Sequence, residues 1–597
     1  MRVLVTGGTG VIGEGLIPAL LEAGHTVRLL SRGAEGDARQ WPRDGVEPFA
    51  ADVTDAKSLR GAAAGCDAVV HVTGIVEEAP PSLTFERVNV KGTKNVLAEA
   101  ARSGVRRFLY VSSLGAERGR SAYHRSKLKA EEVVRASESD WLILRPGNVY
   151  GPGDEVISTL LKLVRTLPAV PVIDDGDQQF QPVWHEDLGR AITSALDRPR
   201  LKHKTLELAG SEVTSTNDVI ERLAAITGRT VARIPVPATL ASLGVRLAEL
   251  MNLGEVAGLK FPLNESKLSM LLEENVVEPA RANALTKTLR VTTTPLDEGL
   301  KMLADMLPEQ LPSEGVGQFE RKRFWADIEG GGYSATELLE AFRARCAEIM
   351  PLEFSAEPGT PRVLEEGVTL TLAVPARGNL QVRVEGVAPQ RITFSTVEGH
   401  MLAGAVQFKT ARVKKGVRFS VEINARAANR LDMVMMNTVG GPLQRSNWEQ
   451  VVERVVELSE GSAPAGVQSE SVTLDEEEAE QIERQLGDVV NRRKRAEREA
   501  AGNGKPAGQR GAARKRATAK AAAKGARKKS AHKSAAKSQR ARAAKSRNKT
   551  TDVDGSRLIP VAIDAVSSLA ASALTAATRA LETAGGGARA RKNRRTN

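Results

Sequence analysis

The chain has 597 residues, of which 41% are hydrophobic and 26% charged, which is ordinary for folded protein and long enough for several domains. Its net charge of +12 is unevenly distributed, because residues 492–549 hold 22 Lys and Arg against two acids, whereas residues 1–491 carry a net charge of −11. Two cysteines exclude a disulfide framework and a cysteine-built zinc site. Because the sequence lacks both a run of about 20 apolar residues and a signal-peptide pattern, we expect a cytoplasmic protein without a transmembrane segment.

Short β-branched runs alternate with helical patterns through roughly the first 200 residues. This alternation predicts an α/β fold with a Rossmann-type, doubly wound parallel sheet. Shorter helical patterns follow and predict a small C-terminal cap, so that residues 1–311 form the first domain. The predicted strands are 3–6, 26–30, 68–71, 107–111 and 141–144, the sheet helices 13–23, 89–103 and 123–137, and the cap helices 217–227, 240–250 and 296–307.

A segment of linker composition, residues 307–317, precedes a second pattern. A helix, a meander of alternating strands and a closing helix predict an α+β domain over residues 318–460. This part weakly resembles the helix-grip (START-like) domains, which can enclose an apolar ligand; the rival interpretation is a packing module. The predicted helices are 335–349 and 448–458, and the strands are 368–374, 380–384, 391–396, 404–408 and 416–423.

The last part of the chain divides by charge. Residues 461–499 predict a helical segment that is acidic at its start and basic at its end, which suits the helix dipole. Residues 500–557 form a basic low-complexity tail that cannot bury a core, so we predict disorder there. Residues 558–597 predict a weakly amphipathic helix and a basic terminus.

A glycine-rich loop follows the first predicted strand and opens the first helix. It reads TGGTGVIG over residues 6–13. Glycines at such positions make the tight turn, let the backbone approach a pyrophosphate and let helix and strand pack closely. The loop therefore predicts a dinucleotide site formed by Gly7, Thr9, Gly10, Val11, Ile12 and Gly13.

The end of the second strand bears on which dinucleotide is bound. Ser31 and Arg32 stand there, without an acid to accept a hydrogen bond from a ribose 2′-hydroxyl. A cation at this point favours a 2′-phosphate, and hence NADP over NAD, although NAD stays open. The competing interpretation is that Arg32 is a solvated surface arginine.

Further motifs stand in order through residues 1–311, and together with the glycine loop they resemble the extended or atypical short-chain dehydrogenase/reductase family. The closest likeness is to the branch of the NADPH-binding accessory subunit of respiratory complex I. The resemblance implies cofactor contacts at Asp52, Val53, Val72, Thr73, Gly74, Asn89, Lys127 and Pro146. The motifs are ADVTD at 51–55, HVTG at 71–74, VNVKGT at 88–93, VSS at 111–113, YHRSK at 123–127, RPGNVYG at 145–151 and QPV at 181–183.

The chemistry of this family needs a tyrosine and a lysine in one cleft. Tyr123 and Lys127 stand one helical turn apart, so their side chains share a face, and an ammonium nearby stabilises a phenolate. Tyr123 is then the acid/base of an NADP(H)-dependent oxidoreductase or epimerase-like enzyme. The resemblance also implies a serine that polarises the substrate oxygen, for which we favour Ser112 over Ser113.

One departure from the family keeps a second interpretation open. The connection from Ser113 to Tyr123 is short, so the usual substrate-covering loop is short or missing. The alternative is therefore a non-catalytic, cofactor-binding structural or sensing protein, in which Tyr123 and Lys127 only clamp the cofactor. The substrate and the oligomeric state do not follow from the sequence.

Two other features have plainer interpretations. His185 could be a catalytic base, but its place predicts a strand end before a helix that Asp187 helps to cap. Residues 174–177 (DDGD) predict a polar turn, and we expect no metal site. In the second domain, Met401 and the methionines at 433–436 are interpreted as core, and His400 as a turn residue.

The basic tail resembles the terminus of a linker histone. Its spread-out cations predict non-specific, salt-sensitive binding to nucleic acid through residues 492–549, which would associate the protein with the nucleoid. The lack of Phe, Trp and Tyr there argues against stacking on single-stranded bases. A membrane surface, another polyanion, the acidic body of the same chain, or no partner at all are the alternatives.

Overall fold

The structure is a computed structural model that describes residues 1–42, 44–239, 273–278, 281–354, 357–359, 362, 364–374, 378–436 and 441–502. All of these lie within one compact unit, residues 1–505. The helix predicted at 240–250 and the tail from residue 503 onward lie outside the described residues.

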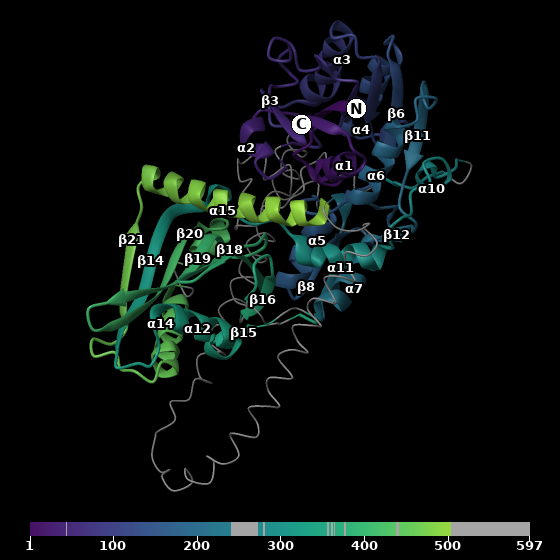
Figure 1. Cartoon of the computed structure of the whole chain (residues 1–597). Coiled ribbons are helices and arrows are strands. Elements are labelled where there is room, and N and C mark those ends of the chain that lie inside the picture. The colour runs from purple at the N-terminus through teal and green to yellow at the C-terminus, as the bar shows by residue number, and fades with distance from the viewer. Residues whose placement is uncertain are drawn as a thin grey trace, which may run out of the picture. The chain divides into compact units, whose positions relative to one another are not determined.

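The first domain is built on a seven-stranded parallel sheet with the strand order β11-β6-β5-β4-β1-β2-β3, which confirms the predicted Rossmann-type fold (Figure 1). The two outer strands, β3 and β11, were not predicted. Each carries charged residues or a proline and is only partly buried, as edge strands often are. The strands are β1 (Arg2–Thr6), β2 (Thr26–Ser31), β3 (Val46–Ala50), β4 (Ala68–His71), β5 (Arg107–Val111), β6 (Asp140–Pro146) and β11 (Lys204–Leu208).

Helices cover both faces of this sheet (Figure 1). On one face α1 crosses α6 at two glycines: a Cβ on Gly15 would lie 2.1 Å from the His185 carbonyl oxygen, and one on Gly189 would lie 2.2 Å from the Gly15 oxygen. This close crossing fixes the helix that follows the glycine loop. The helices are α1 (Val11–Glu22), α2 (Ala34–Ala38), α3 (Gly92–Arg102), which follows a π-helical turn at Glu86–Lys91, α4 (Ala122–Arg135), α5 (Ile157–Thr166) and α6 (His185–Leu196).

The cap is made of short strand pairs and helices around its own apolar cluster. The predicted helices at 217–227 and 296–307 are confirmed as α7 (Thr216–Thr227) and α11 (Leu296–Met306). The remaining cap elements are β7 (Val149–Tyr150), β8 (Ala169–Ile173), β9 (Gln179–Phe180), β10 (Val183–Trp184), β12 (Thr214–Ser215), β13 (Ala232–Val236) and α10 (Ala284–Lys287).

The second domain is an eight-stranded antiparallel sheet with the order β15-β16-β17-β18-β19-β20-β14-β21, as the predicted α+β class requires (Figure 1). Helices α12 (Ala335–Ile349) and α14 (Gly441–Leu458) share an apolar core with the sheet, and α13 (Arg430–Met435) precedes α14. The strands are β14 (Val316–Glu329), β15 (Glu353–Phe354), β16 (Thr369–Val374), β17 (Gly378–Ala388), β18 (Arg391–Thr396), β19 (Leu402–Val413), β20 (Gly416–Ala427) and β21 (Gln468–Thr473).

The segment of linker composition is packed rather than free. Glu309 is 5% exposed and contacts Arg383, Arg493 and Lys494, the last at 2.8 Å. These three cations hold the pKa of the Glu309 carboxyl far below its usual range against the cost of burial. Through its buried Glu309, this segment is thus bound to Arg383 of the second sheet.

A long helix, α15 (Glu476–Gly502), confirms the predicted acidic-to-basic helix from residue 476 onward. The earlier part of the segment predicted to be helical, residues 461–475, instead contains the strand β21. The basic end of α15 contacts the first domain: the Arg498 guanidinium lies 3.6 Å from the centroid of the Trp41 ring and donates to Glu14 at 2.6 Å. Figure 1 shows α15 running from the second sheet towards α1. Within the described residues, none of the helices is both long enough and apolar enough to cross a bilayer.

Candidate active site

The glycine loop has the geometry that a phosphate-binding turn requires. Gly7 has a positive φ of 73°, and a Cβ there would lie 2.7 Å from the Thr73 amide nitrogen. A Cβ on Gly13 would lie 2.1 Å from the Gly8 carbonyl oxygen, so this residue lets α1 pack against the loop. Gly10 differs, because a Cβ there would meet nothing closer than the Gly7 oxygen at 3.8 Å.

The open side of this loop is where a dinucleotide pyrophosphate fits. Gly10 is the N-cap of α1 and supplies no side-chain cap, so the first amides of the helix are left for an anion. Thr9 and Gly10 are exposed, and Val11 and Ile12 are half-buried beside them. These residues, predicted from the sequence, are therefore the ones that could hold the pyrophosphate.

The residues predicted to contact the adenosine half of a dinucleotide lie at the ends of β2 and β3. Ser31 donates to the Asp37 carboxylate at 2.5 Å, and Arg32 beside it is exposed. Asp52 accepts from the Thr54 amide at 2.8 Å, while the neighbouring Val53 is buried. Asp37 was not predicted as part of this site, because it stands six residues beyond the strand, in α2, and comes close to Ser31 only where the chain turns back.

The end of β4 is held by a buried polar cluster. His71 lies 2.7 Å from the Thr6 hydroxyl and 3.0 Å from the Thr93 hydroxyl, and burial lowers its pKa to about 3, so the ring is neutral. The Val72 and Thr73 amides face the Thr6 carbonyl and hydroxyl at 3.1 and 3.4 Å. The cluster thus fixes the backbone from Val72 to Gly74 against the end of β1.

Asn89 connects this backbone to the helix that carries the predicted catalytic residues. Its side-chain amide donates to the Ile75 carbonyl at 3.1 Å and to the Ser126 hydroxyl at 2.9 Å, and its oxygen accepts from the Ile75 amide at 2.9 Å. All three contacts are short and the residue is 1% exposed. Asn89 therefore sets the distance between the β4 loop and α4.

Lys127 lies at the meeting point of these elements. Its ammonium donates to the Val111 carbonyl at 2.8 Å and lies 4.8 Å from the centroid of the Tyr110 ring. A Cβ on Gly74 would lie 3.3 Å from Lys127 Nζ and 3.4 Å from the Asn89 oxygen. Burial lowers the pKa of Lys127 to about 8, against the opposing charge of Glu131. A ribose placed at Gly74 would be within reach of this amine.

Tyr123 lies in the first turn of α4, near enough to Ser113 for the Ser113 hydroxyl to act on the pKa of its phenol. Burial raises the pKa of Tyr123 to about 12, the Ser113 hydroxyl lowers it, and the charge of Glu155 raises it further. Phe85 covers the ring at a centroid distance of 6.2 Å. The phenol is therefore neutral near pH 7. Its pKa is raised by burial, which is the opposite of the phenolate stabilisation that the sequence led us to expect from Lys127.

The preference for Ser112 over Ser113 does not fit the structure. Ser112 is buried and donates to Glu131 at 2.6 Å, whereas the Ser113 hydroxyl is the one that lowers the pKa of Tyr123. The reason is the extended backbone at the end of β5, where successive side chains point to opposite faces. The motif identified both serines as candidates, but the sequence does not show which of the two side chains points toward Tyr123.

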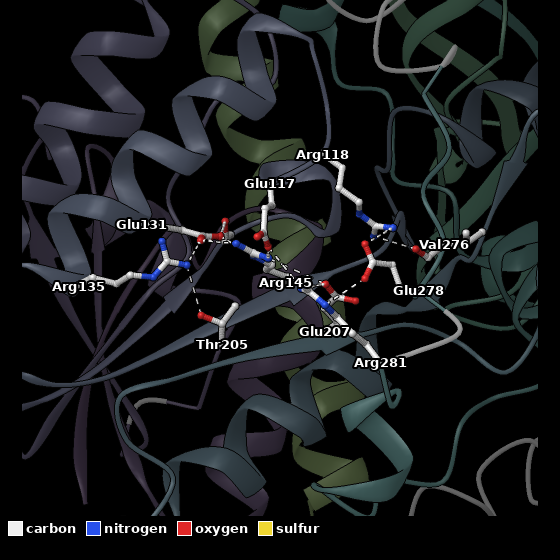
Figure 2. Close-up of polar contacts among 11 residues, drawn as sticks. Glu117, Arg118, Glu131, Arg135, Arg145, Thr205, Glu207, Val276, Glu278 and Arg281 are labelled. Atoms are coloured by element: carbon white, nitrogen blue, oxygen red, sulfur yellow. Dashed lines mark hydrogen bonds and ion pairs between the residues drawn. The ribbon is translucent and has the colours of Figure 1, made fainter.

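A buried network of charges lies beside α4 (Figure 2). Arg145, next to the predicted cofactor residue Pro146 at the end of β6, donates to both oxygens of Glu131 and to Glu117. Arg281 contacts Glu207 at 2.7 Å and Glu117 at 3.3 Å, so the network ends at the surface. Its members come from five separate stretches of sequence, and no local pattern predicted it.

The plainer interpretations of the remaining candidates are confirmed in part. His185 begins α6 and is 3% exposed, and neither ring nitrogen has a hydrogen-bond partner among the described residues, so it is a core residue. Asp187 does not cap α6, since its carboxylate accepts from the Thr294 amide at 2.6 Å. The DDGD segment is a turn in which Asp175 accepts from the Asp177 amide at 3.1 Å.

Comparison with known proteins gives the family of the first domain. Residues 3–209 match the NAD dependent epimerase/dehydratase family. The ceramide reductase of Caulobacter vibrioides (strain NA1000 / CB15N) is 36% identical over 181 residues, covering 29% of this chain and 53% of that protein. NADH dehydrogenase (ubiquinone) 1 alpha subcomplex subunit 9, mitochondrial, of Arabidopsis thaliana is 31% identical over 224 residues, covering 36% and 56%.

These matches are partial on both sides, and the chain spans about half the length of the curated relatives it matches. Among solved structures, the UDP-glucose 4-epimerase of Thermotoga maritima covers 51% of this chain and 97% of its own at 19% identity and a TM-score of 0.40. The family match and the parallel sheet agree with the resemblance inferred from the motifs. Residues 3–209 are therefore a domain of the NAD dependent epimerase/dehydratase family, within the extended short-chain dehydrogenases/reductases.

Proposed function

We propose that this protein is an NADP(H)-dependent oxidoreductase that acts on a carbonyl or alcohol group, with Tyr123 as its acid/base. The observation that carries the proposal is the buried Lys127, which donates to the Val111 carbonyl and faces Gly74. Lys127 lies one helical turn from Tyr123, whose pKa the Ser113 hydroxyl lowers. One relative is named a ceramide reductase, and this supports a reduction as the class of reaction. The substrate itself is open.

The residues divide the work of a carbonyl reduction between them. The bound nicotinamide would supply the hydride. Ser113 and Tyr123 would both donate hydrogen bonds to the carbonyl oxygen, and Tyr123 would give up its proton as that oxygen becomes negative. The cation at Lys127 would stabilise the resulting phenolate and hold the ribose.

Selectivity for NADP rests on the adenosine side. Arg32 is exposed beside Ser31, where a 2′-phosphate would lie, and this favours NADP. The Asp37 carboxylate, which accepts from Ser31, is the group that would instead receive a ribose 2′-hydroxyl and favour NAD. The proposal commits to Arg32, because Asp37 already has a donor at 2.5 Å.

The cofactor half is tested by titrating the full-length protein with NADPH and with NADH and following the nicotinamide fluorescence. We expect tighter binding of NADPH, and we expect Arg32→Ser to remove the difference without changing NADH affinity. Binding of neither nucleotide would overturn the proposal. The catalytic half is tested by following NADPH oxidation with a panel of aldehydes, ketones and quinones, and NADP⁺ reduction with the matching alcohols.

The alternative function is a non-catalytic protein that binds the cofactor for structural or sensing purposes. The short connection between Ser113 and Tyr123 supports it, and so does one relative that is named as a subunit of NADH dehydrogenase. It predicts nucleotide binding without turnover of any probe. It also predicts that Tyr123→Phe affects cofactor binding alone.

We also propose that the basic tail binds nucleic acid non-specifically. The charge of residues 492–549 supports this, and part of that charge is used within the folded unit. Arg493 pairs with Glu385 at 2.8 Å and with Glu309 at 2.6 Å, and Arg498 pairs with Glu14. The cations available to a partner are therefore mainly those beyond α15. Cytoplasmic location and association with the nucleoid belong to the same proposal.

A further inference from the structure

A distant stretch of the chain lies against the short connection that leads to Tyr123. This connection, residues 114–121, runs from the end of β5 to the start of α4. The stretch against it consists of residues 273–278 and Arg281, which we call the return segment. About 150 residues of sequence separate the two, so their contact is purely a result of the fold.

Glu273 makes the central contacts of the return segment. One carboxylate oxygen accepts hydrogen bonds from the Arg120 and Ser121 amides, both at 2.7 Å. The other oxygen lies 2.5 Å from His124 Nδ1. Ser121 is the N-cap of α4 and accepts from the His124 amide at 3.2 Å. A single carboxylate therefore contacts the residues on both sides of Tyr123, at the helix end that favours a negative charge.

Charged side chains reinforce this contact on the outer side (Figure 2). Arg118 donates to the Val276 carbonyl at 3.0 Å and pairs with Glu278 at 3.4 Å. Arg281 pairs with Glu117 at 3.3 Å. These outer groups are partly exposed and contribute less than Glu273, whose side chain is 19% exposed.

The return segment is itself hydrogen-bonded to the cap, and these bonds hold the backbone next to Glu273 in place. The Gln181 amide donates to the Asn275 carbonyl at 2.9 Å, and the Asn275 amide donates to the Gln179 carbonyl at 3.2 Å. The Val277 amide donates to the side chain of Gln181 at 3.2 Å. Backbone pairing of this kind does not depend on Glu273, so a change at Glu273 leaves the segment attached.

We propose that Glu273 is a positioning residue for Tyr123: by holding the Arg120 and Ser121 amides and His124, it sets the first turn of α4 and with it the position of the Tyr123 hydroxyl. This inference rests on the proposed function, because it assigns Glu273 to the reaction that Tyr123 performs. It also gives the short connection the support that a longer substrate-covering loop would provide. Glu273 touches neither substrate nor cofactor in this role.

The test compares three variants of the full-length protein. Glu273→Ala removes every contact of the carboxylate, whereas Glu273→Gln keeps one oxygen that can accept from the two amides. Glu274→Ala is the control, because it removes an exposed charge at the adjacent position. Hydrogen–deuterium exchange is measured on peptides covering residues 114–127 with NADPH bound. We expect exchange at residues 120–121 to be about tenfold or more faster in Glu273→Ala, close to wild type in Glu273→Gln, and unchanged in Glu274→Ala.

Kinetics then separate positioning from a merely structural role. With any carbonyl probe that the wild type reduces, we expect kcat of Glu273→Ala to fall by up to about 100-fold while KM for NADPH stays within about twofold. Unchanged exchange at residues 120–121 would overturn the proposal whatever the activity. Faster exchange with an unchanged kcat would overturn it as well. If the wild type reduces no probe, the reductase proposal fails, and exchange alone decides whether Glu273 holds α4.

Discussion

Arg145 faces Glu131 through two parallel hydrogen bonds, 2.8 Å from Nε and 2.7 Å from Nη2, although both side chains are almost fully buried. The pair ties the end of β6 to α4, one helical turn beyond Lys127. Since Ser112 donates to the same carboxylate, Glu131 also fixes the end of β5. The three elements that carry the proposed site thus meet at one carboxylate.

Breaking this pair should destabilise the first domain strongly. Glu131→Gln leaves the buried Arg145 without its main counter-charge, and we expect the free energy of unfolding to fall by about 3–5 kcal/mol. Urea unfolding followed by tryptophan fluorescence measures this. Glu132→Gln, at the exposed neighbouring position, is the control and should change stability by less than about 0.5 kcal/mol. Equal effects of the two substitutions would contradict the account.

Much of the fold was predictable because it depends on local patterns. The glycine loop, the strands before it and after it, and the Tyr123–Lys127 spacing are all encoded within a few neighbouring residues. The contacts of Glu131 and Glu273 were not predictable, because most of their partners lie far away in the sequence. Glutamate is also usually exposed, so nothing in the local sequence indicates that these two side chains are largely buried. Glu309 is the clearest case: it stands in a stretch of linker composition, yet it is buried among three cations.

The stability of the first domain should fall in acid because of His71. Its pKa is lowered from 6.5 to about 3 in the folded state, so the unfolded chain binds a proton that the folded protein does not. The stabilising effect is complete above pH 6.5 and is lost as the pH falls towards 3, at about 1.4 kcal/mol per pH unit. In His71→Asn this slope should be smaller, as urea unfolding at pH 7, 6 and 5 would reveal.

The control for this experiment is His203→Asn. His203 is exposed and has a positive φ of 53°, which asparagine tolerates. This variant should keep the full pH slope of the wild type. If His71→Asn and His203→Asn gave the same slope, His71 would not be the buried neutral group described above.

The end of α15 should depend on Arg498 for its attachment. The guanidinium stacks on Trp41 and pairs with Glu14, which together are worth about 1–2 kcal/mol. We expect Arg498→Ala to speed hydrogen exchange in the last turns of α15 by about fivefold to thirtyfold. Arg484→Ala, which removes only the exposed pair with Glu480, is the matched control and should leave exchange there unchanged. An equal response of both variants would count against the contact.

Nucleic-acid binding should reside in residues 503–597 rather than in α15. A chain ending at Gly502 should lose the retardation of duplex DNA at low salt, while its NADPH affinity stays the same. For the full chain, the logarithm of the binding constant should fall steeply with the logarithm of salt concentration, by about 0.9 for each neutralised phosphate. DNA retardation that survives the truncation would refute the assignment to the tail.

The central claim is that Tyr123 transfers a proton in a reaction that uses NADPH. The direct measurement is the rate of NADPH oxidation by the wild type and by Tyr123→Phe with the best carbonyl probe, alongside NADPH affinity by fluorescence. The account predicts that the variant loses about 100-fold to 10,000-fold in kcat and binds NADPH as the wild type does. An unchanged rate in Tyr123→Phe would contradict this role of Tyr123, whereas NADPH binding without oxidation by the wild type with any probe would leave only the non-catalytic, cofactor-binding function.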